Sequence, residues 1–177
     1  MNTKHAFSLG VTHISKDPGS TLSFDLVGYI DDLKVGSSYV GRNTEIEVSG
    51  IAEAVHGGIL ISGHIVTSWG GECRRCLEDA SGRIDVSVRE LFERQDKDSG
   101  PSLDTDTYRY VGEVLDLRDM VKDQVLLELP IAPLCKTECR GLCVHCGVNL
   151  NQAQCDCELS IRDPRWNVLD ALLDKDR

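Results

Sequence analysis

Cysteine is the residue type that gives this chain its clearest potential for chemistry, since eight of the 177 residues are cysteines. Two form the pair Cys73-Arg74-Arg75-Cys76. Six more fall within 23 residues, at Cys135, Cys139, Cys143, Cys146, Cys155 and Cys157. Two thiolates spaced two residues apart can hold one ion, because a tight turn points both sulfurs inward. The first residues lack the apolar stretch of a secretory signal, so we expect a cytoplasmic protein with reduced thiols, in which clustered cysteines indicate metal ligands before disulfides.

The spacing of the cysteines divides them into two candidate zinc sites. Cys143-Val144-His145-Cys146-Gly147 has the form of a zinc knuckle, in which glycine supplies the backbone freedom that the turn needs. Cys155 and Cys157 can complete that site. Cys135 and Cys139 are then left to pair with Cys73 and Cys76, which would tie two distant segments together. Four thiolates leave zinc no open position for water, so both sites would be structural rather than catalytic.

Three other interpretations of the cysteines remain open. The chain could hold a single zinc ion and bury its remaining thiols, or it could hold an iron–sulfur cluster, which also takes four cysteine ligands. Cys73 and Cys76 also have the spacing of a thiol redox pair. Such a pair normally lies at a helix N-terminus in an α/β fold, whereas this one follows a strand-like segment.

Charge and motif content argue against several classes of protein. The net charge is −10, so the chain lacks the positive surface of a free-standing nucleic-acid binder. The concentrated basic residues are those beside the cysteines, and they either face RNA or a protein partner or balance the charge of the metal thiolates: Arg74, Arg75, Lys136 and Arg140. No catalytic motif of a hydrolase, metalloprotease or nucleotide-binding enzyme is present. We therefore expect no enzymatic activity, no small-molecule substrate and, with no apolar run near 20 residues, no membrane span.

The periodicity of the apolar residues predicts the elements that must position the cysteines. Residues 21–93 alternate apolar and polar side chains, as in Leu22, Phe24 and Leu26, which is typical of half-buried antiparallel strands. We expect a β-rich core here, an antiparallel sheet or an open barrel, with turns at Gly57-Gly58 and Gly70-Gly71. Residues 1–20 are polar and predict an irregular entry segment.

The C-terminal half changes to a helical period. After an acidic loop over 94–107, we expect a packed helix within 108–130, capped by Asp116 and ended by Pro130. Its apolar face is predicted to comprise Leu117, Met120, Val121 and Val125. A Cys-rich zinc-knuckle segment follows over 131–160, and Asp163-Pro164 predicts a terminal helix over 163–174. The whole chain, 1–177, then forms one α+β domain.

Several motifs in order resemble the YceD family of large ribosomal RNA subunit accumulation proteins. They are Gly-Glu-Cys-Arg-Arg-Cys-Leu (71–77), Leu-x-Leu-Pro (127–130), Cys-Arg-Gly-Leu-Cys-x-x-Cys-Gly-x-Asn-Leu-Asn (139–151) and Asp-Pro-Arg (163–165). The resemblance implies a non-enzymatic ribosome-biogenesis factor that supports accumulation of large-subunit ribosomal RNA. Its implied partners are the pre-ribosomal large subunit, its RNA or a basic ribosomal protein. The alternatives are a cytosolic thiol redox protein and a zinc-stabilised interaction module unrelated to ribosomes.

Overall fold

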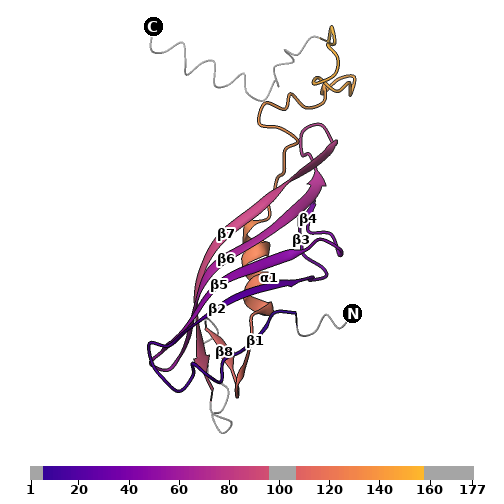
Figure 1. Cartoon of the computed structure of the whole chain (residues 1–177). Coiled ribbons are helices and arrows are strands. Elements are labelled where there is room, and N and C mark those ends of the chain that lie inside the picture. The colour runs from indigo at the N-terminus through magenta and orange to yellow at the C-terminus, as the bar shows by residue number, and fades with distance from the viewer. Residues whose placement is uncertain (1–5, 96–106, 158–177) are drawn as a thin grey trace, which may run out of the picture.

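An open seven-stranded sheet dominates the computed structural model, which describes residues 6–95 and 107–157 (Figure 1). Its strands are β2 (Thr21–Gly28), β3 (Lys34–Val35), β4 (Ser38–Tyr39), β5 (Ile46–Val55), β6 (Gly58–Glu72), β7 (Asp79–Arg94) and β8 (Tyr108–Tyr110). A second, two-stranded sheet pairs β1 (Ser8–Gly10) with β9 (Val114–Asp116), and the described residues contain one helix, α1 (Arg118–Glu128). No described helix has the length and apolarity to span a membrane.

Strand β6 is the centre of the large sheet because it is long enough to pair with three other strands. Its first half pairs with β5, its far end meets β4 at Gly70, and β7 runs antiparallel beside all of it. β2 pairs with the outer side of β5, and β8 adds to β7 in the parallel sense. The described strands do not close on themselves, and the core predicted over 21–93 is an open and mostly antiparallel sheet.

One face of this sheet is buried, and α1 lies against it (Figure 1). The burial of β7 alternates residue by residue, as the sequence pattern predicted for a half-buried strand. The predicted helix face is also confirmed, since Leu117, Met120, Val121 and Val125 are fully buried. Gln124 adds a polar contact from the helix to the sheet by donating from Nε2 to Glu90 Oε1 at 3.2 Å.

Within the predicted range 108–130 the helix occupies Arg118–Glu128, close to the start predicted at Asp116 and the end predicted at Pro130. It begins at Arg118, because residues 108–110 and 114–116 are strands separated by a turn in which Gly112 has φ of 81°. The ring of Tyr108 stacks on Phe92 of the neighbouring strand with centroids 5.1 Å apart, and this contact favours the strand. Asp116 Oδ1 accepts a hydrogen bond from the Arg118 amide at 3.0 Å, although Leu117 holds the N-cap position.

The described part of the predicted irregular entry segment, residues 6–20, is irregular apart from β1, but several of its side chains are packed in the core. Phe7, Leu9, Val11 and Ile14 are buried in the main core, and β1 pairs in register with β9. The partner strand lies about a hundred residues further along the chain, so no local pattern could reveal the pairing. Most of the predicted acidic loop and all of the predicted helix over 163–174 lie outside the described residues.

Of the two predicted glycine turns, the structure contains one. Gly57, with φ of 91°, turns the chain between β5 and β6. Gly70 and Gly71 instead lie inside β6, opposite Ser81 and Ala80 of β7. A Cβ on Gly71 would lie 2.8 Å from the carbonyl oxygen of Ser37, so glycine at this position lets the β3–β4 turn approach the strand. The β6–β7 hairpin therefore continues unbroken to Glu72, and the Cys73–Cys76 turn forms its tip.

Candidate metal centres

The eight thiols gather into two groups of four. We name Cys73, Cys76, Cys135 and Cys139 the inner centre, and Cys143, Cys146, Cys155 and Cys157 the outer centre. Within each group all four Sγ atoms lie within 4.8 Å of one another, and none of the eight cysteines forms a disulfide. This is the division that the spacing predicts. Each group could hold one metal ion.

The distances inside the inner centre fit a tetrahedral ion. Cys73 Sγ lies 3.8 Å from Cys139 Sγ, and Cys76 Sγ lies 3.5 Å from Cys135 Sγ. A zinc ion with four sulfurs at about 2.3 Å places those sulfurs about 3.8 Å apart. Cys73, Cys76 and Cys139 are buried and Cys135 is half-buried, so the arrangement is closed to solvent on most sides.

The tip of the β6–β7 hairpin supplies the first half of the inner centre. The Cys73 amide donates to the carbonyl of Glu78 at 2.8 Å, which closes the hairpin. The Leu77 amide donates to the carbonyl of Cys73 at 2.9 Å, and Leu77 itself has a left-handed backbone with φ of 62°. This tight turn points both sulfurs to the same side.

The segment after α1 supplies the second half and is fastened to the hairpin tip by its backbone (Figure 1, upper end). The Arg74 amide donates to the carbonyl of Pro133 at 2.9 Å, and the Leu142 amide donates to the carbonyl of Arg75 at 3.0 Å. The Arg75 guanidinium donates from Nη1 to the carbonyl of Cys139 at 2.8 Å. These bonds position the inner centre from both sides.

The outer centre repeats the same turn. The Gly147 amide donates to the carbonyl of Cys143 at 2.9 Å, and Gly147 has φ of 73°. The Cys143 amide donates to the carbonyl of Val148 at 2.8 Å. Cys143 is buried, Cys146 is exposed, and the other two ligand candidates are half-buried. The outer centre is thus the more accessible of the two.

Within each centre, the surroundings favour ionisation of some thiols and oppose it for others. Burial opposes ionisation of Cys73, but backbone amides, that of Cys135 first, outweigh it and lower the pKa of its thiol to about 6. A hydrogen bond to Cys76, together with burial, raises the pKa of Cys135 to about 12.

The outer centre shows the same contrast. The backbone amides of Cys146 and His145 lower the pKa of Cys143 to about 6. A hydrogen bond to Cys146, together with burial, raises the pKa of Cys157 to about 12. Each centre therefore presents a thiolate that can capture an ion and also a thiol that must lose its proton on binding.

The basic residues picked out by the sequence surround the inner centre. Arg74, Arg75, Lys136 and Arg140 are all exposed, and the Arg75 guanidinium also donates to the carbonyl of Cys139. Exposed carboxylates accompany them in the same segments, at Glu72, Glu78, Asp79 and Glu138. The surface at this end of the protein consequently carries both positive and negative charges.

Sequence reasoning missed three polar residues at the centres. Asn151 donates from Nδ2 to Cys139 Sγ at 3.3 Å. Asn149 and Glu78 hold the segment that carries Asn151. The Asn-Leu-Asn run over 149–151, which follows the knuckle at Cys143–Gly147, is the signal that could have drawn attention to Asn149 and Asn151.

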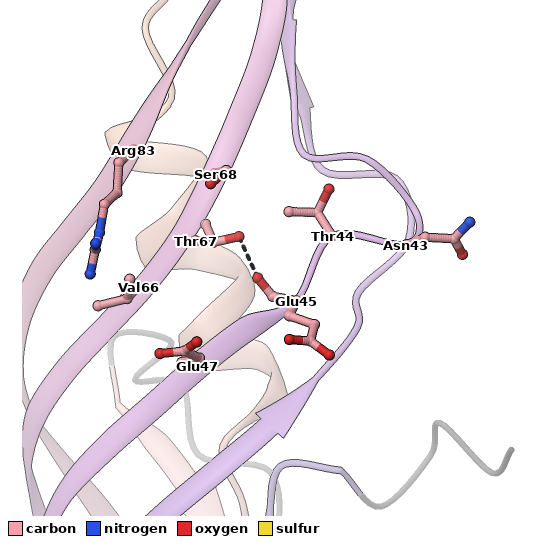
Figure 2. A pocket seen from close by; sticks show the side chains of 8 residues that line it. All are labelled: Asn43, Thr44, Glu45, Glu47, Val66, Thr67, Ser68 and Arg83. Atoms are coloured by element: carbon pink, nitrogen blue, oxygen red, sulfur yellow. Dashed lines mark hydrogen bonds between the residues drawn. The ribbon is translucent and has the colours of Figure 1, made fainter.

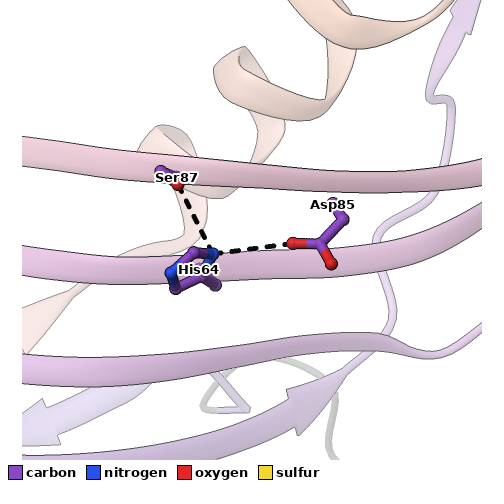
Figure 3. Close-up of polar contacts among 3 residues, drawn as sticks. All are labelled: His64, Asp85 and Ser87. Carbon is purple, nitrogen blue, oxygen red and sulfur yellow. Dashed lines mark hydrogen bonds and ion pairs between the residues drawn. The ribbon is translucent and has the colours of Figure 1, made fainter.

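Polar side chains gather at two places on the large sheet. A hollow of about 450 Å³ beside the start of β5 is lined mainly by polar side chains, with Thr67 donating to the carbonyl of Glu45 at 2.8 Å (Figure 2). His64, Asp85 and Ser87 are of the three residue types found in a catalytic triad (Figure 3). Both partners, however, contact the same ring atom, Nδ1, at 3.5 Å, whereas a triad uses opposite ring nitrogens.

The described residues form an open, mostly antiparallel sheet with one packed helix. Two four-cysteine centres lie at one end of it, and the tip of the β6–β7 hairpin supplies two of the cysteines. The chain belongs to the YceD family: residues 61–173 match the family of the Large ribosomal RNA subunit accumulation protein YceD. That match includes all eight cysteines and all of the β6–β7 hairpin except the first three residues of β6.

Individual relatives support the assignment. The "Uncharacterized protein Rv2926c" of Mycobacterium tuberculosis is 38% identical over 122 residues, which cover 68% of this chain and 58% of the relative. The chain thus spans less than two thirds of these mycobacterial proteins. The "Uncharacterized protein YlbN" of Bacillus subtilis is 26% identical over 164 residues, covering 90% of this chain and 92% of the relative.

A plant relative carries the family description in its name. The "Large ribosomal RNA subunit accumulation protein YCED homolog 1, chloroplastic" of Arabidopsis thaliana is 36% identical over 55 residues, covering 31% of this chain and 17% of the relative. No solved structure matches this chain.

Proposed function

We propose that this protein is a non-enzymatic, cytoplasmic ribosome-biogenesis factor that supports accumulation of large-subunit ribosomal RNA. The observation that carries the proposal is the family match over residues 61–173, a family named for that role. The matched range also holds all eight cysteines, which supports a part for the two centres in the proposed role.

Zinc is the ion that we assign to both centres. Four thiolates at tetrahedral spacing are its typical structural ligand set, and the backbone amides at Cys73 and Cys143 already favour the thiolate form. Zinc would supply cross-linking there: it would join the β6–β7 tip to the segment after α1 and close the turn that begins at Cys143. The hairpin tip and the segment after α1 would then form a rigid end of the protein. Its surface would be fixed by the two metal centres rather than by a large apolar core.

This rigid end is the docking surface in our proposal. It presents Leu142 and residues 147–151 together with Arg74, Arg75, Lys136 and Arg140. The chain as a whole carries −10, so affinity for RNA alone would be modest, and a pre-ribosomal particle offers basic proteins as well as RNA. The proposed partner is therefore the assembling large subunit, contacted at its RNA or at a basic ribosomal protein.

The experiment that tests the role measures the ratio of large-subunit to small-subunit ribosomal RNA in cells depleted of the protein. We expect a selective fall in the large-subunit RNA, restored by the wild-type gene. A depleted strain with an unchanged ratio would refute the proposed role and leave a metal-stapled interaction module.

A further inference from the structure

One loop of the outer centre makes direct contact with the inner centre. Residues 147–154 connect Cys146 to Cys155, so both ends of this loop are anchored by ligands of the outer centre. From the middle of the loop, Asn151 donates from Nδ2 to Cys139 Sγ, a ligand of the inner centre, at 3.3 Å. The same side chain accepts a hydrogen bond from the Arg140 amide at its Oδ1, at 2.9 Å. Asn151 thus bonds a ligand sulfur of one centre from a loop that the other centre closes.

Neighbouring side chains hold the Asn151 amide in this orientation. Asn149 Oδ1 accepts from both the Asn151 side chain and the Asn151 backbone amide, at 2.9 and 3.0 Å. Asn149 and Gln152 each donate to Glu78 Oε1, at 3.3 and 3.2 Å. Glu78 lies on the hairpin, two residues after Cys76. The loop therefore touches both halves of the inner centre, through Cys139 and through Glu78.

The bond from Asn151 acts on the charged state of the sulfur. An amide that donates to a thiolate stabilises the negative charge, and such contacts around a metal ligand are typically worth about 10- to 100-fold in metal affinity. The inner centre thus obtains part of its affinity from outside its own four ligands.

Closure of the loop determines whether this bond is available. With an ion joining Cys143, Cys146, Cys155 and Cys157, the loop has fixed ends and Asn151 needs little further ordering. Without that ion the backbone hydrogen bonds at Gly147 and Val148 still hold the start of the loop, but its end at Cys155 loses the ligand bond. Ordering the loop against Cys139 then costs more conformational entropy.

We propose that Asn151 couples the two metal centres, so that an ion in the outer centre raises the affinity of the inner centre. Because coupling between two binding sites is reciprocal, an ion in the inner centre raises the affinity of the outer one equally. Loading of one centre then favours loading of the other, although each can still bind an ion by itself. This inference rests on the proposed metal binding and adds a specific residue to it.

The test uses the full chain in buffers of fixed free zinc and follows protection of individual thiols from alkylation by mass spectrometry. Protection of Cys73 reports the inner centre, and protection of Cys157 reports the outer one. Asn151→Ala should raise the free zinc needed to protect Cys73 by about tenfold. Emptying the outer centre with Cys155→Ser and Cys157→Ser should have a similar effect.

The combination of these changes decides between coupling and two separate effects. If the coupling runs through Asn151, the triple variant protects Cys73 at about the same free zinc as Asn151→Ala alone, so the effects do not add. The inference would be overturned if the triple variant multiplied the two increases in the free zinc needed to protect Cys73. It would also be overturned if that concentration rose less than twofold in Asn151→Ala or in the serine variant. Gln154→Ala is the matched control, since Gln154 is exposed in the same loop and should leave both protection curves unchanged.

Failure of the metal proposal itself would look different. A wild-type chain whose thiols stay unprotected at every zinc concentration would refute metal binding and the coupling together. A wild type that protects both centres, in which Asn151→Ala also matches wild type, would refute the coupling alone. Asn151→Ala removes no thiol and no core side chain, and thermal unfolding of the sheet verifies that each variant is folded.

Discussion

Leu77 and Gly147 occupy equivalent places in the two cysteine turns. Each follows the second cysteine of a Cys-x2-Cys pair and donates its amide to the carbonyl of the first, at 2.9 Å in both turns. Each also has a left-handed backbone, with φ of 62° at Leu77 and 73° at Gly147. Glycine adopts this conformation freely, whereas a leucine pays for it with steric strain of about 1–2 kcal/mol.

Substitutions at these two positions should therefore change the zinc affinity of their centres in opposite directions. Leu77→Gly relieves the strain, less the entropy that glycine gains in the unfolded chain, and should strengthen zinc binding at the inner centre by roughly 0.5 kcal/mol. Gly147→Ala should weaken the outer centre by about 1 kcal/mol, although a Cβ there meets no atom within 4 Å, because its cost lies in the backbone. Competition against a chelator measures both. A weakening in Leu77→Gly would show that the exposed leucine side chain stabilises the turn.

Metal analysis of the purified protein should find two zinc ions per chain. Cys76→Ser should reduce the content to one if the ions occupy separate centres, and Cys146→Ser should do the same. All eight thiols should resist alkylation until a chelator is added. Rapid alkylation of Cys73 and Cys76 before chelation, with no metal bound, would instead favour the redox interpretation.

Reversal of charge at the metal end should weaken association with the pre-ribosomal large subunit. Arg74→Glu combined with Arg140→Glu replaces two exposed cations, and we expect loss of co-sedimentation with the particle at an unchanged melting temperature. Arg89→Glu, an exposed arginine on β7 in the middle of the sheet, is the matched control. Retained co-sedimentation in the double variant would exclude these arginines from the interface.

The glycine inside β6 should be intolerant of a side chain. Gly71→Ala places a Cβ 2.8 Å from the backbone oxygen of Ser37, and we expect a loss of roughly 1–3 kcal/mol in the free energy of unfolding. Gly10→Ala is the comparison, because a Cβ there meets nothing within 4 Å. Denaturant unfolding of the two variants should differ clearly; equal stabilities would show that the β3–β4 turn yields at little cost.

The hydrogen-bonded hydroxyl of Tyr108 should make the free energy of unfolding fall at alkaline pH. Burial and the hydrogen bond from its hydroxyl to Asp123 Oδ2, at 3.0 Å, raise the pKa of Tyr108 to about 12. Since the unfolded value is 10.0, the contribution to stability is complete below pH 10 and is lost as the pH rises through 12. The difference in ultraviolet absorbance between wild type and Tyr108→Phe follows this titration. Asp123→Asn should move the titration toward pH 10, and an unmoved titration would remove Asp123 as a cause.

Local patterns in the sequence were sufficient for the features that depend on near neighbours. Alternation marked β2, β5, β6 and β7, because one face of each strand is buried. The spacing of Met120, Val121 and Val125 marked the buried face of the helix for the same reason. Cysteine spacing likewise predicted two groups of four thiols, since a tight turn can bring two nearby sulfurs to one ion.

Only the tertiary structure decided the features that join distant segments. Phe7 and Leu9 enter the core because β1 meets β9, and Tyr108 is in a strand because β7 offers it an edge and a stacking ring. Gly71 is extended because it pairs with Ala80 of β7, and the β3–β4 turn packs closely on it. The hydrogen bond from Asn151 to Cys139 exists because the outer centre's loop folds back over the inner one. Each of these features depends on contact with a segment far away in the sequence. A local pattern does not encode which segment that is, because packing of the whole chain selects it.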